Sequence, residues 1–182
     1  LFVFWLRGER EAGLYSAAYS IFLGTQLVWN AFLVSLFAHA SRRFPDDPAS
    51  FWAGWYRALI QVSVLTTTTG LGLSIFGGFV ITLIYGSRYL EGASVLPLLL
   101  TANVLLALNS LCGMALVVSG SSGPIVRAHM FAFLLYVPLS LSLVSRYGFV
   151  GSGLAAVATH SAMFIVLIRA VAVRRAALAA TP

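Results

Sequence analysis

The residues best suited to functional chemistry are serines, amides and a histidine that lie inside long apolar stretches of the sequence. The candidates are Ser16, Ser20, Gln26, Asn30, Asn103 and His160, with Asn109 as a further amide. A polar group that is buried in lipid without a partner is costly, so these side chains must face protein or a wet cavity. Two interpretations stay open: hydrogen bonds between neighbouring helices, or the lining of a cavity that offers hydrogen bonds to a substrate.

His160 is the one histidine placed deep in an apolar stretch, on a helical face with Ser152 and Ala156. An ionisable group inside a membrane is a functional candidate by default. The alternative is a neutral histidine that bonds to a neighbouring hydroxyl. His39 and His129 fall near the ends of the apolar stretches, where an interfacial role is expected.

Catalytic chemistry has no support in the residue pattern. The apolar stretches contain no Asp or Glu, there is no His/Glu pair at helical spacing, and no glycine loop suited to a phosphate. Cys112 is the only cysteine, which supports neither a disulfide framework nor a metal site. Asp46 and Asp47 belong to a solvated turn between two prolines. We therefore expect neither an enzyme nor a bound metal or cofactor.

The composition of the chain indicates that these residues lie in a membrane. Apolar residues make up 60% of the 182-residue chain and charged residues 9%, against about 45–50% and about 25% in soluble domains. The charged residues fall in six patches, at 7–11, 42–57, 88–91, 127, 146 and 169–175. A helix needs about 20 apolar residues to cross the hydrocarbon core, so each of the five intervals holds one crossing.

The sequence therefore predicts an all-α membrane protein with five transmembrane helices. The expected spans are 14–38, 58–85, 93–118, 128–145 and 149–168. Residues 1–6 are too short to span alone, and we expect them to be the tail of a preceding sixth helix. The alternating strands of an outer-membrane barrel are absent from the pattern.

Arginine placement predicts the orientation. Because crossings alternate sides, Arg42, Arg43, Arg57, Arg127, Arg169, Arg174 and Arg175 share one side, and Arg7, Arg10, Arg88 and Arg146 share the other. Excess Arg stays cytoplasmic, so the C-terminus is expected in the cytoplasm. A net charge of +6 could indicate nucleic acid, but arginines at helix ends indicate anchoring at the membrane surface.

The second expected span carries small residues at a spacing of four. Gly70, Ser74 and Gly78 form one stripe, which allows a neighbouring helix backbone to approach closely. Glycines also weaken a helix locally. The stripe is either a packing seam or a hinge near 66–72.

Three stretches resemble the C-terminal lobe of polysaccharide flippases, the exporters of lipid-linked oligosaccharides in the MATE-like superfamily. REAGLYSAAYS at 10–20 is similar to the start of the second helix of that lobe. IYGSRYLEGASVLPLLL at 84–100 resembles an external turn, and SRYGFVGSGLAAVATHS at 145–161 resembles the penultimate turn. The order and spacing of the three stretches carry the resemblance across most of the chain.

The resemblance implies half of a two-lobed transporter bundle in the cytoplasmic (inner) membrane, with an N-terminal lobe as its partner. The implied substrate is an undecaprenyl-phosphate-linked oligosaccharide, moved toward the outer leaflet for O-antigen or teichuronic acid type polysaccharides. An ion gradient or the membrane potential would supply the energy. On this reading the polar edge through Ser16, Ser20 and Asn30 faces the cavity.

The sequence departs from the resemblance at two positions. Many relatives place a basic residue where Ser20 stands and a proline near Ala38. Without that base, this lobe lacks a cation for the substrate's pyrophosphate. An ion-coupled multidrug or small-solute exporter of the same superfamily and a non-transporting membrane subunit are the alternatives.

Overall fold

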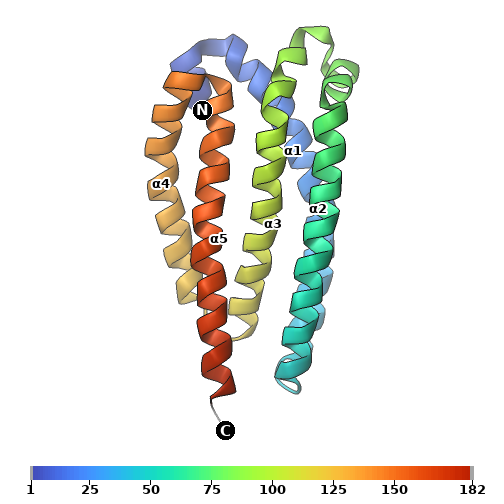
Figure 1. Ribbon diagram of the computed structural model, residues 1–182, viewed down its shortest axis with the longest axis vertical. Helices are drawn as coiled ribbons and strands as arrows, with labels where there is room; N and C mark the ends of the chain where they lie inside the picture. The colour runs from blue at the N-terminus through green and yellow to red at the C-terminus, as the bar shows by residue number, and fades with distance from the viewer. Residues whose placement is uncertain (1, 181–182) are drawn as a thin grey trace.

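The computed structural model describes residues 2–180, and every regular element in that range is a helix (Figure 1). The long helices are α1 (Phe2–Arg43), α2 (Pro48–Tyr85), α3 (Leu96–Val118), α4 (Gly123–Tyr147) and α5 (Phe149–Ala179), and a short 3₁₀ helix, η1 (Ser87–Val95), precedes α3. Within residues 2–180, five helical segments are long and apolar enough to cross a membrane. The prediction of an all-α chain with five helices long and apolar enough to span a membrane is therefore confirmed, whereas the two-lobed architecture stays a prediction.

Helices α1, α2, α4 and α5 extend beyond the expected spans, whereas α3 begins at Leu96, after the expected start at 93, because residues 93–95 belong to η1. Helix α2 begins at Pro48, well before the expected span at 58–85, because the preceding turn supplies a start signal. The Asp47 side chain accepts a hydrogen bond from the Ser50 N–H at 2.9 Å, and Pro48 occupies the first helical turn, where a missing N–H does no harm. Which part of each helix lies in lipid stays a prediction.

Helix α1 contains one break. Gly8 has φ 84° and ψ −176°, which are not helical values, so residues 2–7 form a separate turn or two before the long helix. Leu1 lies outside the described residues. That residues 1–6 end a preceding helix stays a prediction.

Glycines end two helices at the same end of the bundle. Gly86 closes α2 with φ 89°, and Gly148 alone separates α4 from α5 with φ 60°. Glycine adopts positive φ without the steric penalty of a side chain, which suits it to helix C-termini. A connection of one residue makes α4 and α5 antiparallel neighbours.

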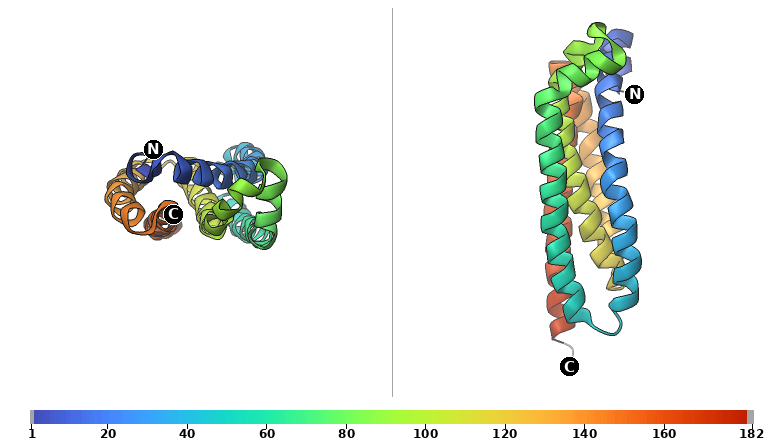
Figure 2. Two further views of the ribbon diagram at one scale, coloured as in Figure 1. Left: turned by 90° about the horizontal axis from the view of Figure 1, so that it is seen from above. Right: turned by 90° about the vertical axis from the view of Figure 1, so that its right-hand side faces the viewer.

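Helix α3 lies at the centre of a long, narrow bundle (Figures 1 and 2). In its most apolar stretch, continuous with η1, 56% of the residues are buried, against 11% in α1 and 22% in α4 and α5. Helix α2 lies on one side of α3 and the α4–α5 pair on the other, while α1 starts beside the α4–α5 pair and crosses toward α2 (Figure 1). Every helix except α3 thus has a broad outward face.

The small residues of α2 form a packing seam. Gly70 is buried, and a Cβ there would lie 3.6 Å from the Leu100 Cβ. Gly77 is closer still, since a Cβ would lie 2.5 Å from Leu96 Cδ1. The seam against α3 therefore runs through Gly70 and Gly77, with Ser74 at its half-buried margin. Helix α2 stays helical through residues 66–72, where a hinge was the alternative to a packing seam.

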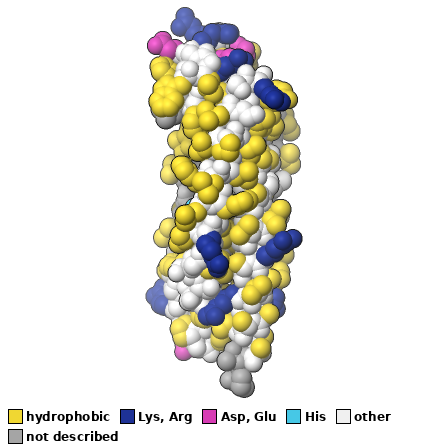
Figure 3. Space-filling model, turned by 90° about the vertical axis from the view of Figure 1, so that its left-hand side faces the viewer, with side chains coloured by type: hydrophobic (Ala, Val, Ile, Leu, Met, Phe, Trp, Pro, Cys, Tyr) yellow, Lys and Arg dark blue, Asp and Glu magenta, His cyan; other side chains and the backbone are white. Residues whose placement is uncertain are grey.

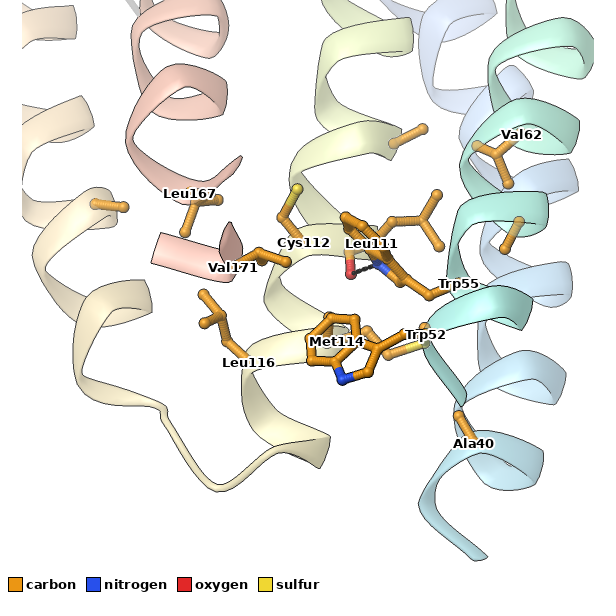
Figure 4. Close-up of a cluster of buried hydrophobic side chains, with 14 of the residues drawn as sticks. Ala40, Trp52, Trp55, Val62, Leu111, Cys112, Met114, Leu116, Leu167 and Val171 are labelled. Carbon is orange, nitrogen blue, oxygen red and sulfur yellow. Dashed lines mark hydrogen bonds between the residues drawn. The ribbon is translucent and has the colours of Figure 1, made fainter. Parts of the chain in front are cut away.

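Two hydrophobic clusters fill the bundle, one toward each end. Figure 4 shows the one toward the C-terminus, where Trp52 and Trp55 of α2 point toward α3, Trp52 beside Met114 and Trp55 beside Leu111. The indole N–H of Trp55 donates to the Leu111 carbonyl at 3.0 Å. Leu167 and Val171 of α5 pack on the far side of α3.

On the face that Figure 3 shows, the surface is mainly apolar along its middle and carries its charged side chains toward both ends. Ile75 of α2 is 75% exposed, as expected of a side chain that meets lipid. We call the end that carries the C-terminus and the turns at 44–47 and 119–122 the arginine-rich end. The expected cytoplasmic arginines lie toward it, and which side of the membrane it faces stays a prediction.

Candidate functional site: the outward face of α1

The six candidate residues do not form one site, because they separate into an exposed group and a buried group. Ser16, Ser20 and Asn30 are exposed on α1, and Gln26 is half-buried on the same helix. Asn103 on α3 is buried, and His160 on α5 is half-buried inside the bundle. The fold thus brings together only the α1 residues.

The exposed group defines a continuous stripe. We call it the outward face of α1, and it comprises Ser16, Ser20, Leu23, Leu27, Asn30 and Val34, all exposed. Steps of three and four residues keep a side chain on one face of a helix, and the opposite face carries buried Ala18 and Trp29. The outward face therefore points away from this bundle.

Hydrogen-bonding capacity on the outward face is largely unused. The Ser20 hydroxyl donates to the Ser16 carbonyl at 2.8 Å, which occupies its proton but leaves its oxygen free to accept. Among residues 2–180, the Asn30 amide makes no hydrogen bond, so it offers both donors and acceptor. A polar group in hydrocarbon costs roughly 2–7 kcal/mol without a partner. On the predicted span of 14–38, Asn30 therefore requires a polar neighbour beyond this bundle.

Asn103 is a hydrogen-bonded joint between α1 and α3. Its side-chain oxygen accepts from the Trp29 indole N–H at 3.1 Å, and its amide donates to the Thr25 hydroxyl at 3.1 Å. The Thr25 hydroxyl in turn donates to the Phe22 carbonyl at 2.7 Å. Of the two interpretations left open by the sequence, interhelical bonding is the one observed for Asn103. Its role is to fix which face of α1 turns outward.

Asn109 and His160 join α3 to α5. The Asn109 amide donates to the His160 backbone carbonyl at 3.1 Å. The Asn109 Oδ1 and His160 Nδ1 atoms are buried and have no hydrogen-bond partner among the described residues, and the same holds for the hydroxyls of Ser140 and Thr159. The expected bond from His160 to a neighbouring hydroxyl is thus not formed.

Charged contacts fix both ends of α5. At its start, Glu11 accepts the backbone N–H of Phe149 at 2.9 Å and pairs with Arg7 at 3.2 Å. Near its other end, the Arg174 guanidinium donates to the Ser119 carbonyl at the end of α3, with Nε at 3.0 Å. An anion at a helix N-terminus and a cation at a C-terminus are both favourable. These contacts hold the start of α5 against α1 and the last turns of α5 against the end of α3.

Sequence reasoning missed Thr25, Trp29 and the role of Glu11. A tryptophan deep in an apolar stretch, away from the interfaces where it is enriched, was the available signal for Trp29. Its partner Asn103 lies 74 positions away, and no local pattern identifies such a pair. Among residues 2–180, no three His, Cys, Asp or Glu side chains lie close enough together to hold a metal.

Comparison with known proteins adds no assignment: the chain matches no protein-family model, no curated protein and no solved structure.

Proposed function

We propose that this chain is the C-terminal lobe of a polysaccharide flippase. It would move undecaprenyl-phosphate-linked oligosaccharide across the cytoplasmic membrane, in partnership with an N-terminal lobe. The observation that carries the proposal is the outward face of α1, where Ser20 and Asn30 present unused hydrogen-bonding capacity in the middle of an apolar helix. The resemblance of the three sequence stretches to flippases supplies the substrate class.

The physical argument starts from Asn30. An exposed amide at this depth needs water, a sugar hydroxyl or another helix, because lipid tails offer no hydrogen bonds. A water-filled path between two lobes meets that need, and transporters of this kind place substrate sites at the interface between their repeats. The amide can both donate to and accept from sugar hydroxyls, while Ser20 can accept. These groups bind and guide; none performs a covalent step.

Apolar side chains separate the polar ones along the outward face of α1. Leu23 and Leu27 stand between Ser20 and Asn30 and are 44% and 73% exposed. Because polar and apolar side chains alternate, any one sugar receives few hydrogen bonds. This arrangement favours movement of the sugar chain along the face and disfavours tight binding. The face carries no cation, so recognition of the pyrophosphate falls to another part of the transporter.

A non-transporting membrane subunit is the second candidate, and a specific observation favours it. Asn103 and Asn109 use their amides to join helices within this bundle, as a scaffold would. In that case another protein helix covers Asn30. The two candidates therefore differ in whether the outward face of α1 is wet.

Cysteine accessibility separates these candidates. Leu27→Cys and Ile75→Cys form a matched pair, since the two residues are 73% and 75% exposed on α1 and α2. The single native cysteine, Cys112, is buried and gives a low background. In the intact protein in membranes, a membrane-impermeant maleimide should label Leu27→Cys and leave Ile75→Cys unlabelled. Equal protection of both cysteines would refute a wet path along α1.

Transport by the intact protein tests the substrate class. Ser20→Asp places a repulsive charge on the outward face of α1 and should slow export of an anionic lipid-linked sugar. Ser94→Asp is the matched control, because Ser94 is exposed on η1 at the end of the bundle. Flipping of labelled substrate in reconstituted vesicles is the measurement. Unchanged flipping by Ser20→Asp at normal protein level would contradict the proposal.

A further inference from the structure

The α4–α5 pair forms a surface cavity of about 580 Å³ at the arginine-rich end. It lies between the start of α4 and the second half of α5, away from the outward face of α1. Arg127, Arg169 and Arg174 line it together with Pro124, Val166 and Val173. On the side of the molecule that Figure 3 shows, basic side chains interrupt the apolar surface toward this end. The cavity thus combines positive charge with an apolar wall.

The cavity has an uncompensated positive charge. No acidic residue lines it, and the two ion pairs among residues 2–180 lie at the opposite end, between Arg7 and Glu11 and between Arg10 and Glu91. Arg174 is engaged by the Ser119 carbonyl. Arg127 and Arg169 are exposed and are the two cations available to an anionic ligand.

The depth of these arginines matches a lipid headgroup. Arg127 and Arg169 are each twenty residues from the connection between α4 and α5, at Tyr147 and Phe149. Twenty residues of helix span about 30 Å, which is the thickness of the hydrocarbon core. If the α4–α5 connection lies at one membrane surface, both guanidinium groups lie at the other.

The apolar wall suits an acyl chain. Val166 and Val173 line the cavity on α5 and are 38% and 71% exposed, so they present carbon surface to an occupant. A free anion would gain nothing from this wall. Helix α4 also begins at the cavity, with Pro124 in its first turn, so the positive end of its dipole adds to the field of the arginines.

We propose that this cavity binds an anionic phospholipid of the leaflet at the arginine-rich end, with its phosphate held by Arg127 and Arg169 and an acyl chain along Val166 and Val173. Basic pockets between transmembrane helices are suited to such headgroups. The site does not depend on the proposed transport function, since a membrane subunit would bind the same lipid. Bound lipid would connect α4 and α5 at this end of the bundle.

The test is a lipid titration of the purified intact protein in detergent, followed by native mass spectrometry. The probes are phosphatidylglycerol, phosphatidylcholine and inorganic phosphate alone. Arg127→Gln with Arg169→Gln removes the two available cations. The matched control is Arg88→Gln with Arg146→Gln, which removes the same charge from exposed positions toward the opposite end. Each arginine near the surface contributes about 1 kcal/mol to lipid binding. Affinity for phosphatidylglycerol should therefore fall about 30-fold in the Arg127→Gln, Arg169→Gln variant and should be unchanged in the control variant.

Val173→Trp provides a second, charge-neutral variant. It fills the cavity while leaving every arginine in place, so it should also weaken phosphatidylglycerol binding. Three results would overturn the proposal: equal losses in the two arginine double variants, equal affinity for phosphatidylcholine, or displacement of the lipid by inorganic phosphate. The last result would mark a general phosphate site in place of a lipid site.

Discussion

Replacing Glu11 with alanine should weaken the contact between α1 and α5 at the end of the bundle opposite the arginine-rich end. The Glu11 side chain is only 24% exposed, and it accepts the Phe149 N–H at 2.9 Å while pairing with Arg7. A hydrogen bond to a charged group contributes about 1.5–3 kcal/mol, and an ion pair near the surface about 0.2–1 kcal/mol. We expect Glu11→Ala to lower the free energy of unfolding by about 2 kcal/mol, mostly through the backbone bond.

Glu91→Ala is the matched control at the same end of the bundle. Glu91 also pairs with an arginine, Arg10, at 2.7 Å, but the two side chains are 56% and 79% exposed. Exposed pairs contribute about 0.2–1 kcal/mol because water and salt screen them. The same substitution should therefore cost less than half as much at Glu91 as at Glu11.

The assay is unfolding of the purified protein in a mild detergent, followed by helical circular dichroism at low and moderate salt. Glu11→Ala should unfold well before the parent at both salt concentrations, since its main bond is shielded from solvent. Glu91→Ala should differ from the parent only at low salt. Equal stability losses, or a Glu11 loss that vanishes with salt, would show that the Phe149 N–H is not held by Glu11 as described.

Two further outcomes are expected in the same assay. A double-mutant cycle of Asn103→Leu and Trp29→Phe should give a coupling of about 0.6 kcal/mol and no more than about 1.7 kcal/mol, the range for hydrogen bonds between membrane helices; additive losses would disprove the bond. Gly151→Ala should destabilise by about 1–3 kcal/mol, because its Cβ would lie 2.1 Å from the Leu143 carbonyl oxygen. Gly113→Ala, with no atom within 4 Å of the added Cβ, should be neutral or stabilising by up to about 1 kcal/mol. A larger loss of stability for Gly113→Ala than for Gly151→Ala would contradict the packing described.

The helix count and class followed from the charge pattern alone. Uncharged intervals long enough to cross a membrane recur five times, and a backbone in lipid must bond to itself. Such constraints are local, so they can be read along the chain. The ends of the helices could be predicted less accurately from the sequence, since α2 begins at Pro48 and α5 continues to Ala179. Interfacial residues continue a helix as readily as apolar ones, and hydropathy marks only the lipid portion.

The candidate residues show the limit of local patterns most clearly. Asn30 and Asn103 are both amides in apolar stretches, and the sequence leaves the same two roles open for each. The tertiary structure gives Asn103 two partners on α1 and turns Asn30 outward. What separates them is the rotation of α1 against α3, which depends on contacts between residues more than 70 positions apart. The sequence by itself determined that these polar groups need partners, because that is a property of the residue and its solvent; only the packing of the helices decided which partners they have.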